Sequence, residues 1–192
     1  MIHTAGFNKR RVTVGEIDHW HKLRGFLREE QWYSEFSPDL KHIGYNYFIT
    51  KEGGIFSGRH EEEQGAHCRN GGMNRYAIGI CMEGHGDHEV FTLAQDYSLF
   101  SICHDICTRH PDILRKGSAA LLGHREARGV KKTCPGILIN MEQYRTNFFK
   151  EVISKFSTNG GIPELLKIDL MDTIQHSLEI DTKIIPKTTR SL

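Results

Sequence analysis

The alternation of apolar and polar positions predicts several short strands. Apolar and polar residues alternate from Ile43 to Thr50, as in a strand with one buried face. The turn residues Lys51–Gly54 then lead into a second strand at Ile55–Gly58, which predicts a hairpin. Two mostly apolar runs, Tyr76–Met82 and Ala119–Gly123, are typical of buried strands, and the second would deliver His124 at its end.

Two capping-box patterns predict where helices begin. Thr13–Glu16 has this pattern and predicts a helix that reaches Arg24, with Gly25 as its stop. Thr92–Gln95 repeats the pattern and predicts a helix that ends near His110. Helices and strands in this order predict an α/β fold, a single domain in which helices flank a central mixed β-sheet.

The last part of the chain is predicted to be a short helical extension. Phe148–Phe156 and Pro163–Leu178 both have helical patterns. Residues 147–192 are too few for an independent core, so we expect them to pack on the domain formed by residues 1–146. The tail, Lys187–Leu192, is predicted to be disordered.

Composition and charge exclude several classes of function. The 25 basic and 24 acidic residues give a net charge of +1, so there is no electrostatic case for nucleic acid or an anionic membrane surface. No apolar run is long enough for stable membrane insertion. The first residues lack the apolar core of a signal peptide, so we expect synthesis in the cytoplasm. Five irregularly placed cysteines argue against a disulfide framework and favour a reducing compartment.

Candidate metal ligands lie at two distant places in the chain. His3 is near the N-terminus, and His124 and Cys134 lie in the segment GHREARGVKKTCPG, Gly123–Gly136. Two imidazoles and a thiolate suit zinc, and a catalytic zinc has three protein ligands with the fourth position left to water. Lys132 would add a cation beside the metal. Ligand-type residues are common in a chain of this size, so their spacing alone is weak evidence.

Further motifs make the pattern specific. They are EIDHWHKLRGF (Glu16–Phe26), IGYNYFITKEGGIFSGR (Ile43–Arg59), GAHCRNGGMNRYAIGICMEG (Gly65–Gly84) and the segment Gly123–Gly136. In order and spacing they resemble the zinc-dependent N-acetylmuramoyl-L-alanine amidases. That family includes the amidase-type bacteriophage lysozymes and the animal peptidoglycan recognition proteins. The resemblance runs from His3 to about Arg145 and is closest to the phage branch.

The resemblance implies an activity and a cofactor. The activity is hydrolysis of the amide bond between N-acetylmuramic acid and the L-alanine that begins the stem peptide of peptidoglycan. The cofactor is one Zn²⁺ per chain, held by His3, His124 and Cys134. The expected partner is therefore peptidoglycan or a muropeptide.

The resemblance also assigns roles near the metal. Tyr45 and Lys132 are the implied catalytic residues: the phenol orients water or donates to the oxyanion, and the ammonium stabilises the oxyanion. His67, Asn74 and Asn46 are weaker candidates for contact with the substrate.

Three places depart from the family pattern. Only two residues precede His3, so the strand that carries it is either very short or incomplete in this sequence. Asn46 stands where relatives often have histidine after the tyrosine. Residues 27–42 form a polar and aromatic loop that is longer than its phage counterpart, and its aromatic residues are predicted to wall the substrate groove.

Other histidines and cysteines have simpler interpretations. Cys103 and Cys107 lie one turn apart and are expected in the buried stripe of their helix rather than at a metal. His19 and His21 are two residues apart on a helix, so their side chains diverge and cannot hold one ion together.

Three classes of function stay open. The leading one is a lytic zinc amidase, a phage or prophage endolysin that acts on the cell wall after release; a bacterial recycling amidase also fits the chain length. The second is a non-catalytic module that binds muropeptides, against which Cys134 counts because silent relatives tend to lose that residue. The third is an amidase that also binds and regulates a phage RNA polymerase, although nothing in the sequence marks such a surface.

Overall fold

The computed structural model describes residues 1–7 and 10–158. These residues form two compact units. The first contains Met1–Ser101 and Leu121–Met141, and the second contains Ile102–Ala120 and the chain from Glu142 onward. All predicted site residues belong to the first unit. The predicted helix at Pro163–Leu178 and the predicted disordered tail lie outside the described residues.

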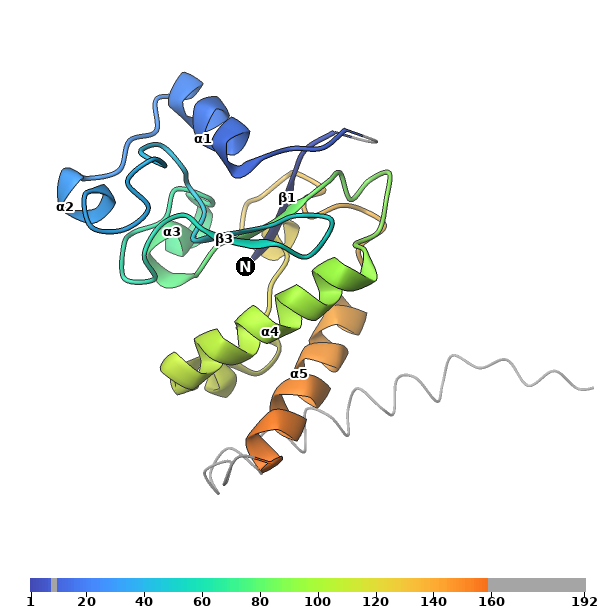
Figure 1. The fold of residues 1–192 in the computed structure, drawn as a ribbon. Coiled ribbons are helices and arrows are strands. Elements are labelled where there is room, and N and C mark those ends of the chain that lie inside the picture. Colours follow the sequence, from blue (N-terminus) through green and yellow to red (C-terminus); the bar gives the residue numbers. More distant parts are fainter. Residues whose placement is uncertain (8–9, 159–192) are drawn as a thin grey trace, which may run out of the picture. The chain divides into compact units, whose positions relative to one another are not determined.

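A four-stranded sheet forms the centre of the first unit (Figure 1). The strands follow the order β1 (Ile2–Ala5), β4 (Ile80–Glu83), β2 (Tyr47–Ile49) and β3 (Ile55–Ser57). Strand β4 runs parallel to β1 and β2, and β2 and β3 form an antiparallel hairpin. The predicted α/β class with a mixed sheet is therefore confirmed.

The hairpin turn is confirmed, but the strands are shorter than predicted. The Thr50 amide donates to the Gly54 carbonyl at 2.9 Å, which closes the turn. Backbone groups of residues 44–46 bond to loops outside the ladder, so β2 begins only at Tyr47. The next strand was predicted at Tyr76–Met82, but Tyr76 is the last residue of the short helix α3 (Met73–Tyr76), and β4 begins only at Ile80.

The strand that carries His3 is short and well paired. All four residues of β1 pair with β4, and His3 lies opposite Cys81. His3 is almost fully buried, with 1% of its surface exposed. Ladder pairing on one side and burial thus hold this residue near the N-terminus, where an unpaired end would fray.

Helix α1 (Val14–Leu23) covers one face of the sheet, as Figure 1 shows in blue. The predicted capping box is confirmed: the Thr13 hydroxyl accepts from the Glu16 amide, and the Glu16 carboxylate accepts from the Thr13 amide. The apolar side of the helix packs into a core cluster with residues of the sheet, whose buried members are Val12, Ile17, Ile43, Tyr45, Phe48 and Cys81.

Helix α4 (Leu93–Arg109) begins at the second predicted capping box. The Thr92 hydroxyl accepts from the backbone amide of Gln95, and the side-chain Oε1 of Gln95 accepts from the backbone amide of Thr92. The buried Gln95 amide group also donates to the Glu83 carbonyl at 2.9 Å, so the helix start is fixed at the end of β4. Cys103 and Cys107 are buried as expected, and burial raises the pKa of both thiols to about 12.

The predicted strand at Ala119–Gly123 is wrong. Pro111–Ala120 is a 3-10 segment, η2, that is broken at Gly117, where φ is +54°. Ala119 is exposed, so this stretch cannot be a strand buried on both faces. The chain reaches the sheet only through one parallel bridge between Ile2 and Gly123.

Helix α5 (Met141–Thr158) begins earlier than the predicted helix at Phe148–Phe156 and runs through residue 146. The division into residues 1–146 and 147–192 stays a prediction. Within the described part of the chain, no helix is both long enough and apolar enough to cross a membrane.

A buried ion pair anchors the loop of residues 27–42, which contains the short helix α2 (Glu30–Tyr33). The guanidinium of Arg28 donates to both oxygens of Glu63, and both side chains are almost fully buried. Arg28 also donates to the carbonyl groups of three loop residues, Phe36, Ser37 and Leu40. The loop is therefore a fixed part of the first unit.

Candidate metal centre and its cleft

A cleft of about 740 Å³ opens above the sheet of the first unit. One wall is formed by helix α1, through Trp20 and His21, and by Arg24 and Phe26, which follow it. The other wall consists of residues 68–70 and 129–132. The floor contains most of the predicted site residues, which are His3, Tyr45, His67, His124 and Cys134.

His3, His124 and Cys134 come together on this floor. One ligand atom from each lies within 4.8 Å of the other two. His3 lies in β1, and the Thr4 amide that follows it is 3.4 Å from the sulfur of Cys134. The Thr4 hydroxyl also donates to the Pro135 carbonyl at 3.0 Å, so β1 holds the cysteine segment directly.

A short turn places His124 beside β1. The Ile2 amide donates to the Leu122 carbonyl at 2.7 Å, and the 3-10 turn η3 (His124–Glu126) begins after the bridge. The Glu126 carboxylate accepts from the Gly123 amide and caps this turn. Sequence reasoning placed His124 correctly next to the sheet, although a turn and not a strand delivers it.

Hydrogen bonds fix the form of the His3 ring. Nε2 of His67 lies 2.9 Å from the Ala77 carbonyl, which can only accept, so this nitrogen carries the proton of the ring. Burial lowers the pKa of His67 to about 3, so the ring is neutral and its Nδ1 accepts. Nε2 of His3 lies 3.1 Å from that Nδ1 and therefore donates. Nδ1 of His3 is left with a free lone pair, the form in which imidazole binds a metal.

Two neighbouring glycines leave the space that the ring of His67 occupies. A Cβ atom at Gly65 or Gly79 would lie 2.6 Å or 2.5 Å from the Cδ2 atom of the ring, so only glycine leaves room for it. Oδ1 of Asn74 accepts from the amides of His67 and Cys68 at 2.8 Å and 2.6 Å. His67 and Asn74 both line the cleft; Asn74 holds the backbone of His67, whose ring in turn meets that of His3.

Lys132 and Tyr45 flank the ligand group. Burial, and then the ammonium of Lys132, lowers the pKa of His124. Burial raises the pKa of Cys134, and the Thr4 hydrogen bonds and the Lys132 charge oppose that rise. Burial, and then the nearby Cys81 and Cys134 thiols, raises the pKa of Tyr45 well above its usual range, so the phenol keeps its proton. Its ring centre lies 5.1 Å from that of His3.

Asn46 is not among the residues that line the cleft, and its predicted contact with substrate stays a prediction. Its side chain is buried: the amide donates to the His60 carbonyl at 2.9 Å, and Oδ1 accepts from the Gly79 amide at 2.8 Å. Asn46 therefore joins neighbouring segments below the site. The sequence alone does not determine whether the side chain of a polar residue at this position faces the cleft or the interior.

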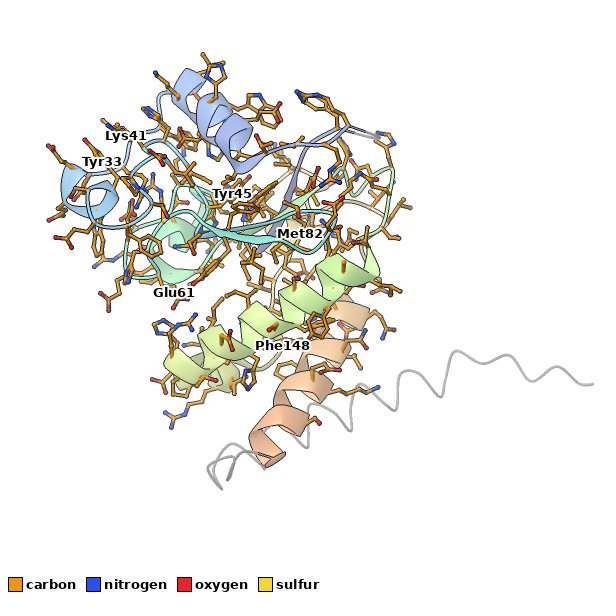
Figure 2. The ribbon with its side chains drawn as sticks, in the orientation of Figure 1. Tyr33, Lys41, Tyr45, Glu61, Met82 and Phe148 are labelled. Carbon is orange, nitrogen blue, oxygen red and sulfur yellow. The ribbon has the colours of Figure 1, made fainter. Side chains whose placement is uncertain are left out.

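The aromatic residues of the loop 27–42 do not line this cleft either. Trp32 stacks on His60, with ring centres 5.6 Å apart, and Lys41 lies over the ring of Tyr33. Figure 2 shows Tyr33 beside Lys41 and away from Tyr45. Their predicted role as a wall of the substrate groove therefore gains no support from this cleft and stays a prediction.

His21 is a cleft residue to which sequence reasoning gave no role. Its Nδ1 accepts from the Gly44 amide at 2.9 Å, and its ring stacks on Phe26. The signal was its position four residues after Ile17, which places both side chains on the buried side of α1. His19, in contrast, is exposed.

This burial predicts that acid destabilises the protein. Burial and the nearby Arg24 and Arg59 charges lower the pKa of His21 from 6.5 to about 4. Between those values the unfolded chain binds a proton that the folded chain refuses, so stability is lost as pH falls from about 6.5 to 4. We expect His21 to account for about 2 kcal/mol of the unfolding free energy lost between pH 7 and pH 5.

Urea unfolding in the presence of a chelator would measure this loss. The variant His21→Asn keeps an acceptor for the Gly44 amide but cannot titrate, so its loss should be smaller by about that amount. His19→Asn, on the exposed side of the same helix, should behave like the parent. An equal loss in all three proteins would contradict the prediction.

The donor set fits zinc. Two neutral imidazoles and a thiolate are ligands that zinc prefers, and three protein ligands leave one position open toward the cleft. Histidines that bind a metal are usually oriented by a hydrogen bond from their other ring nitrogen, and His67 accepts such a bond from His3. Among the described residues this is the one group of three or more such side chains that could hold a metal ion.

Comparisons with known proteins agree with this geometry. The family model for N-acetylmuramoyl-L-alanine amidase matches residues 2–137. The endolysin of Escherichia phage T7 is 30% identical over 129 residues, which cover 65% of this chain and 70% of the relative. Peptidoglycan-recognition protein SC2 of Drosophila simulans is 30% identical over 110 residues, which cover 57% of this chain and 56% of the relative.

Solved structures share the fold. The N-acetylmuramoyl-L-alanine amidase LysC from Clostridium intestinale has a TM-score of 0.56 and 26% identity, and the match covers 76% of this chain and 80% of that protein. The peptidoglycan recognition protein SA of Apis mellifera has a TM-score of 0.50 and 18% identity, over 72% of this chain and 75% of that protein. The second likeness concerns the fold alone.

Proposed function

This chain belongs to the N-acetylmuramoyl-L-alanine amidase family, and from that premise we propose that it cuts peptidoglycan between N-acetylmuramic acid and the first L-alanine of the stem peptide. The observation that carries the proposal is the group His3, His124 and Cys134 on the floor of a cleft, flanked by Lys132 and Tyr45. The whole group lies within the residues that the family model matches.

The proposed cofactor is one zinc ion held by His3, His124 and Cys134. When bound, zinc supplies a water of lowered pKa and polarises the scissile carbonyl. The chain's own contribution starts with His67, which holds the His3 ring in the form that leaves Nδ1 free. The Thr4 amide and hydroxyl hold the Cys134 segment against β1.

Lys132 and Tyr45 are the proposed catalytic residues. The tetrahedral intermediate of amide hydrolysis carries a negative oxygen, and a fixed cation and an O–H donor aimed at that oxygen lower its energy. Lys132 supplies the cation, and its charge already reaches His124 and Cys134. Tyr45 supplies the donor, because burial raises the pKa of its phenol well above the usual range and the oxygen keeps its proton.

We infer the biological role from the same relatives. Endolysin relatives support a lytic role on the cell wall after release from the cell that made the protein. The non-catalytic alternative, a module that binds muropeptides, is less well supported, since all three ligands and both flanking residues are present together. No observation favours the RNA polymerase alternative.

Product analysis of digested peptidoglycan tests the proposal. An amidase releases free stem peptides with new L-alanine amino groups and leaves the glycan strands intact, whereas a glycosidase creates new reducing ends. Chelation should abolish digestion and zinc should restore it. New reducing sugar without new alanine termini would refute the amidase proposal, and binding of muropeptides without any digestion would favour the recognition module.

The position of Asn46 gives a prediction that separates packing from substrate contact. Asn46→Ala leaves the buried Gly79 amide and His60 carbonyl without their partner, which costs about 1–3 kcal/mol of unfolding free energy. KM for a soluble muramyl peptide should not change, since the side chain does not line the cleft. Urea unfolding and steady-state kinetics of the same preparation would check both parts. A raised KM at unchanged stability would restore Asn46 as a substrate contact.

A further inference from the structure

Cys134 lies in a turn that has no regular secondary structure to hold it. Residues 127–140 contain no helix and no strand. Within the turn, the Gly136 amide donates to the Thr133 carbonyl at 2.9 Å, which is a local bond only. The position of the Cys134 thiol therefore depends on bonds that other segments make to this turn.

Arg125, the residue after the proposed ligand His124, holds the turn through its carbonyl groups. The backbone amide of Arg125 donates to the Cys134 carbonyl at 2.6 Å. Its guanidinium donates to three further carbonyl groups of the same segment, those of Thr133, Gly136 and Ile139. A guanidinium has five donors in fixed directions, so it can hold several carbonyl groups in one arrangement. Arg125 thus ties the segment of one proposed ligand to the segment of another.

Asp87, in the loop that follows β4, holds the same turn through its donors (Figure 1). Its Oδ2 accepts from the Thr133 hydroxyl and its Oδ1 accepts from the Ile137 amide, each at 2.7 Å. These two bonds lower the pKa of Asp87, so the carboxylate that makes them is ionised. A Cβ atom at Gly86 would collide with the Pro135 carbonyl, so the two loops meet backbone to backbone.

A turn that is fixed in advance favours metal binding. A zinc–thiolate bond has a defined length of about 2.3 Å, so the sulfur must reach a defined place. Ordering a loose segment during binding costs free energy, which is subtracted from the affinity. Neither Arg125 nor Asp87 is among the residues that line the cleft or among the three ligand side chains. Their contacts are with the turn.

We propose that Arg125 and Asp87 are positioning residues, which hold the Cys134 thiol in place for the metal before the metal binds. The inference rests on the proposed zinc site and adds two residues to which sequence reasoning gave no role. Loss of either residue frees the turn, and zinc binding weakens although all three ligands are still present.

Zinc affinity of side-chain variants is the first test. Arg125→Met removes the guanidinium donors and Asp87→Ala removes both acceptors, and each should lower the affinity about 10–100-fold, as loss of an outer partner of a metal ligand does. Arg125→Lys and Asp87→Asn keep part of the bonding and should fall between these variants and the parent. Arg128→Met and Asp39→Ala remove the same charges from exposed positions and should match the parent. Competition with a chromophoric chelator measures all of them.

Alkylation of the metal-free protein is the second test, and it reads the turn without any metal. Cys134 is half-buried and the other four cysteines are buried, so Cys134 should react first. Freeing the turn should raise its alkylation rate by about three- to tenfold, the effect of one lost hydrogen bond on a local opening. Cys68 and Cys81 should keep their rates, and mass spectrometry of the peptides would assign each rate to its residue.

The charge of Asp87 needs a separate control, because it also raises the pKa of Cys134. Asp87→Asn removes this charge but keeps an acceptor, so its alkylation rate should stay below that of Asp87→Ala. Equal rates in the two variants would assign the effect to charge and overturn the role of Asp87. If Arg125→Met did not fold, Arg125→Lys would give the same comparison for the arginine.

The parent affinity and the parent alkylation rate in both Arg125→Met and Asp87→Ala would overturn the proposal. Weaker zinc binding with an unchanged alkylation rate would show that the turn is ordered only during binding, and a rate that rises equally at Cys68 and Cys81 would show a general loosening of the first unit. Either result would also overturn it. If the parent bound no zinc, the proposed metal site would fail, while the alkylation rates would still decide whether these residues hold the turn.

Discussion

Replacing Lys132 with methionine is expected to lower kcat for muramyl peptide hydrolysis about 10²–10³-fold, the usual effect of removing one group that stabilises an oxyanion. Lys132 lines the cleft, and its charge reaches His124 and Cys134, so it is placed to act on the reacting carbonyl. Methionine keeps most of the apolar length of the side chain and removes only the charge. Bound zinc and the unfolding free energy should stay near those of the parent, because Lys132 is exposed and is not in the ligand group.

The neighbouring Lys131 provides the contrast. It also lines the cleft, but unlike Lys132 it is not among the charges that act on His124 or Cys134, so Lys131→Met should leave kcat nearly unchanged. Tyr45→Phe should lower kcat, as Lys132→Met does, since it removes the second donor. A Lys132→Met variant with the parent kcat and a raised KM would show that Lys132 binds substrate and does not act in the transition state.

Capping boxes and turn residues correctly predicted the helix starts and the hairpin turn, because these features depend only on residues close together in the sequence. The capping boxes at Thr13 and Thr92 fix helix starts through contacts between residues three apart, so the sequence contains the whole interaction. The hairpin turn at residues 51–54 is equally local. The prediction of a strand at Ala119–Gly123 was wrong, because a short apolar run does not reveal whether a partner strand is available for pairing. There the chain meets the sheet edge through a single bridge.

The sequence predicted the three metal ligands, but it did not predict which residues hold them in place. His3, His124 and Cys134 were predicted through resemblance, and the structure brings them together from positions more than 100 residues apart in the chain. The roles of His67 and Asn46 depend on contacts across loops, namely Ala77 and His3 for the first and His60 and Gly79 for the second. No spacing in the sequence encodes such contacts, so both residues were assigned to the substrate.

Zinc affinity is expected to fall in a graded series that separates a ligand from its support. Removing an outer partner of a metal ligand costs about 10–100-fold in affinity, so His67→Ala should lose that much. Cys134→Ser removes a proposed ligand itself and should lose more than about 100-fold, because a neutral hydroxyl does not replace a thiolate. Activity on peptidoglycan should follow zinc occupancy in both variants.

Cys68→Ser is the matched control, since Cys68 lines the same cleft but stands outside the ligand group. Its thiol lies 3.8 Å from the Asn70 carbonyl and is not one of the three ligand side chains, so zinc affinity should stay near that of the parent. Competition with a chromophoric chelator at pH 7.5 would rank the four proteins, with the pH held constant because the ligands bind only in their deprotonated forms. Unchanged affinity in Cys134→Ser would refute the proposed ligand set. A loss in His67→Ala as large as that in Cys134→Ser would instead make His67 a ligand in its own right, in place of the support for His3 that its hydrogen bond to Ala77 indicates.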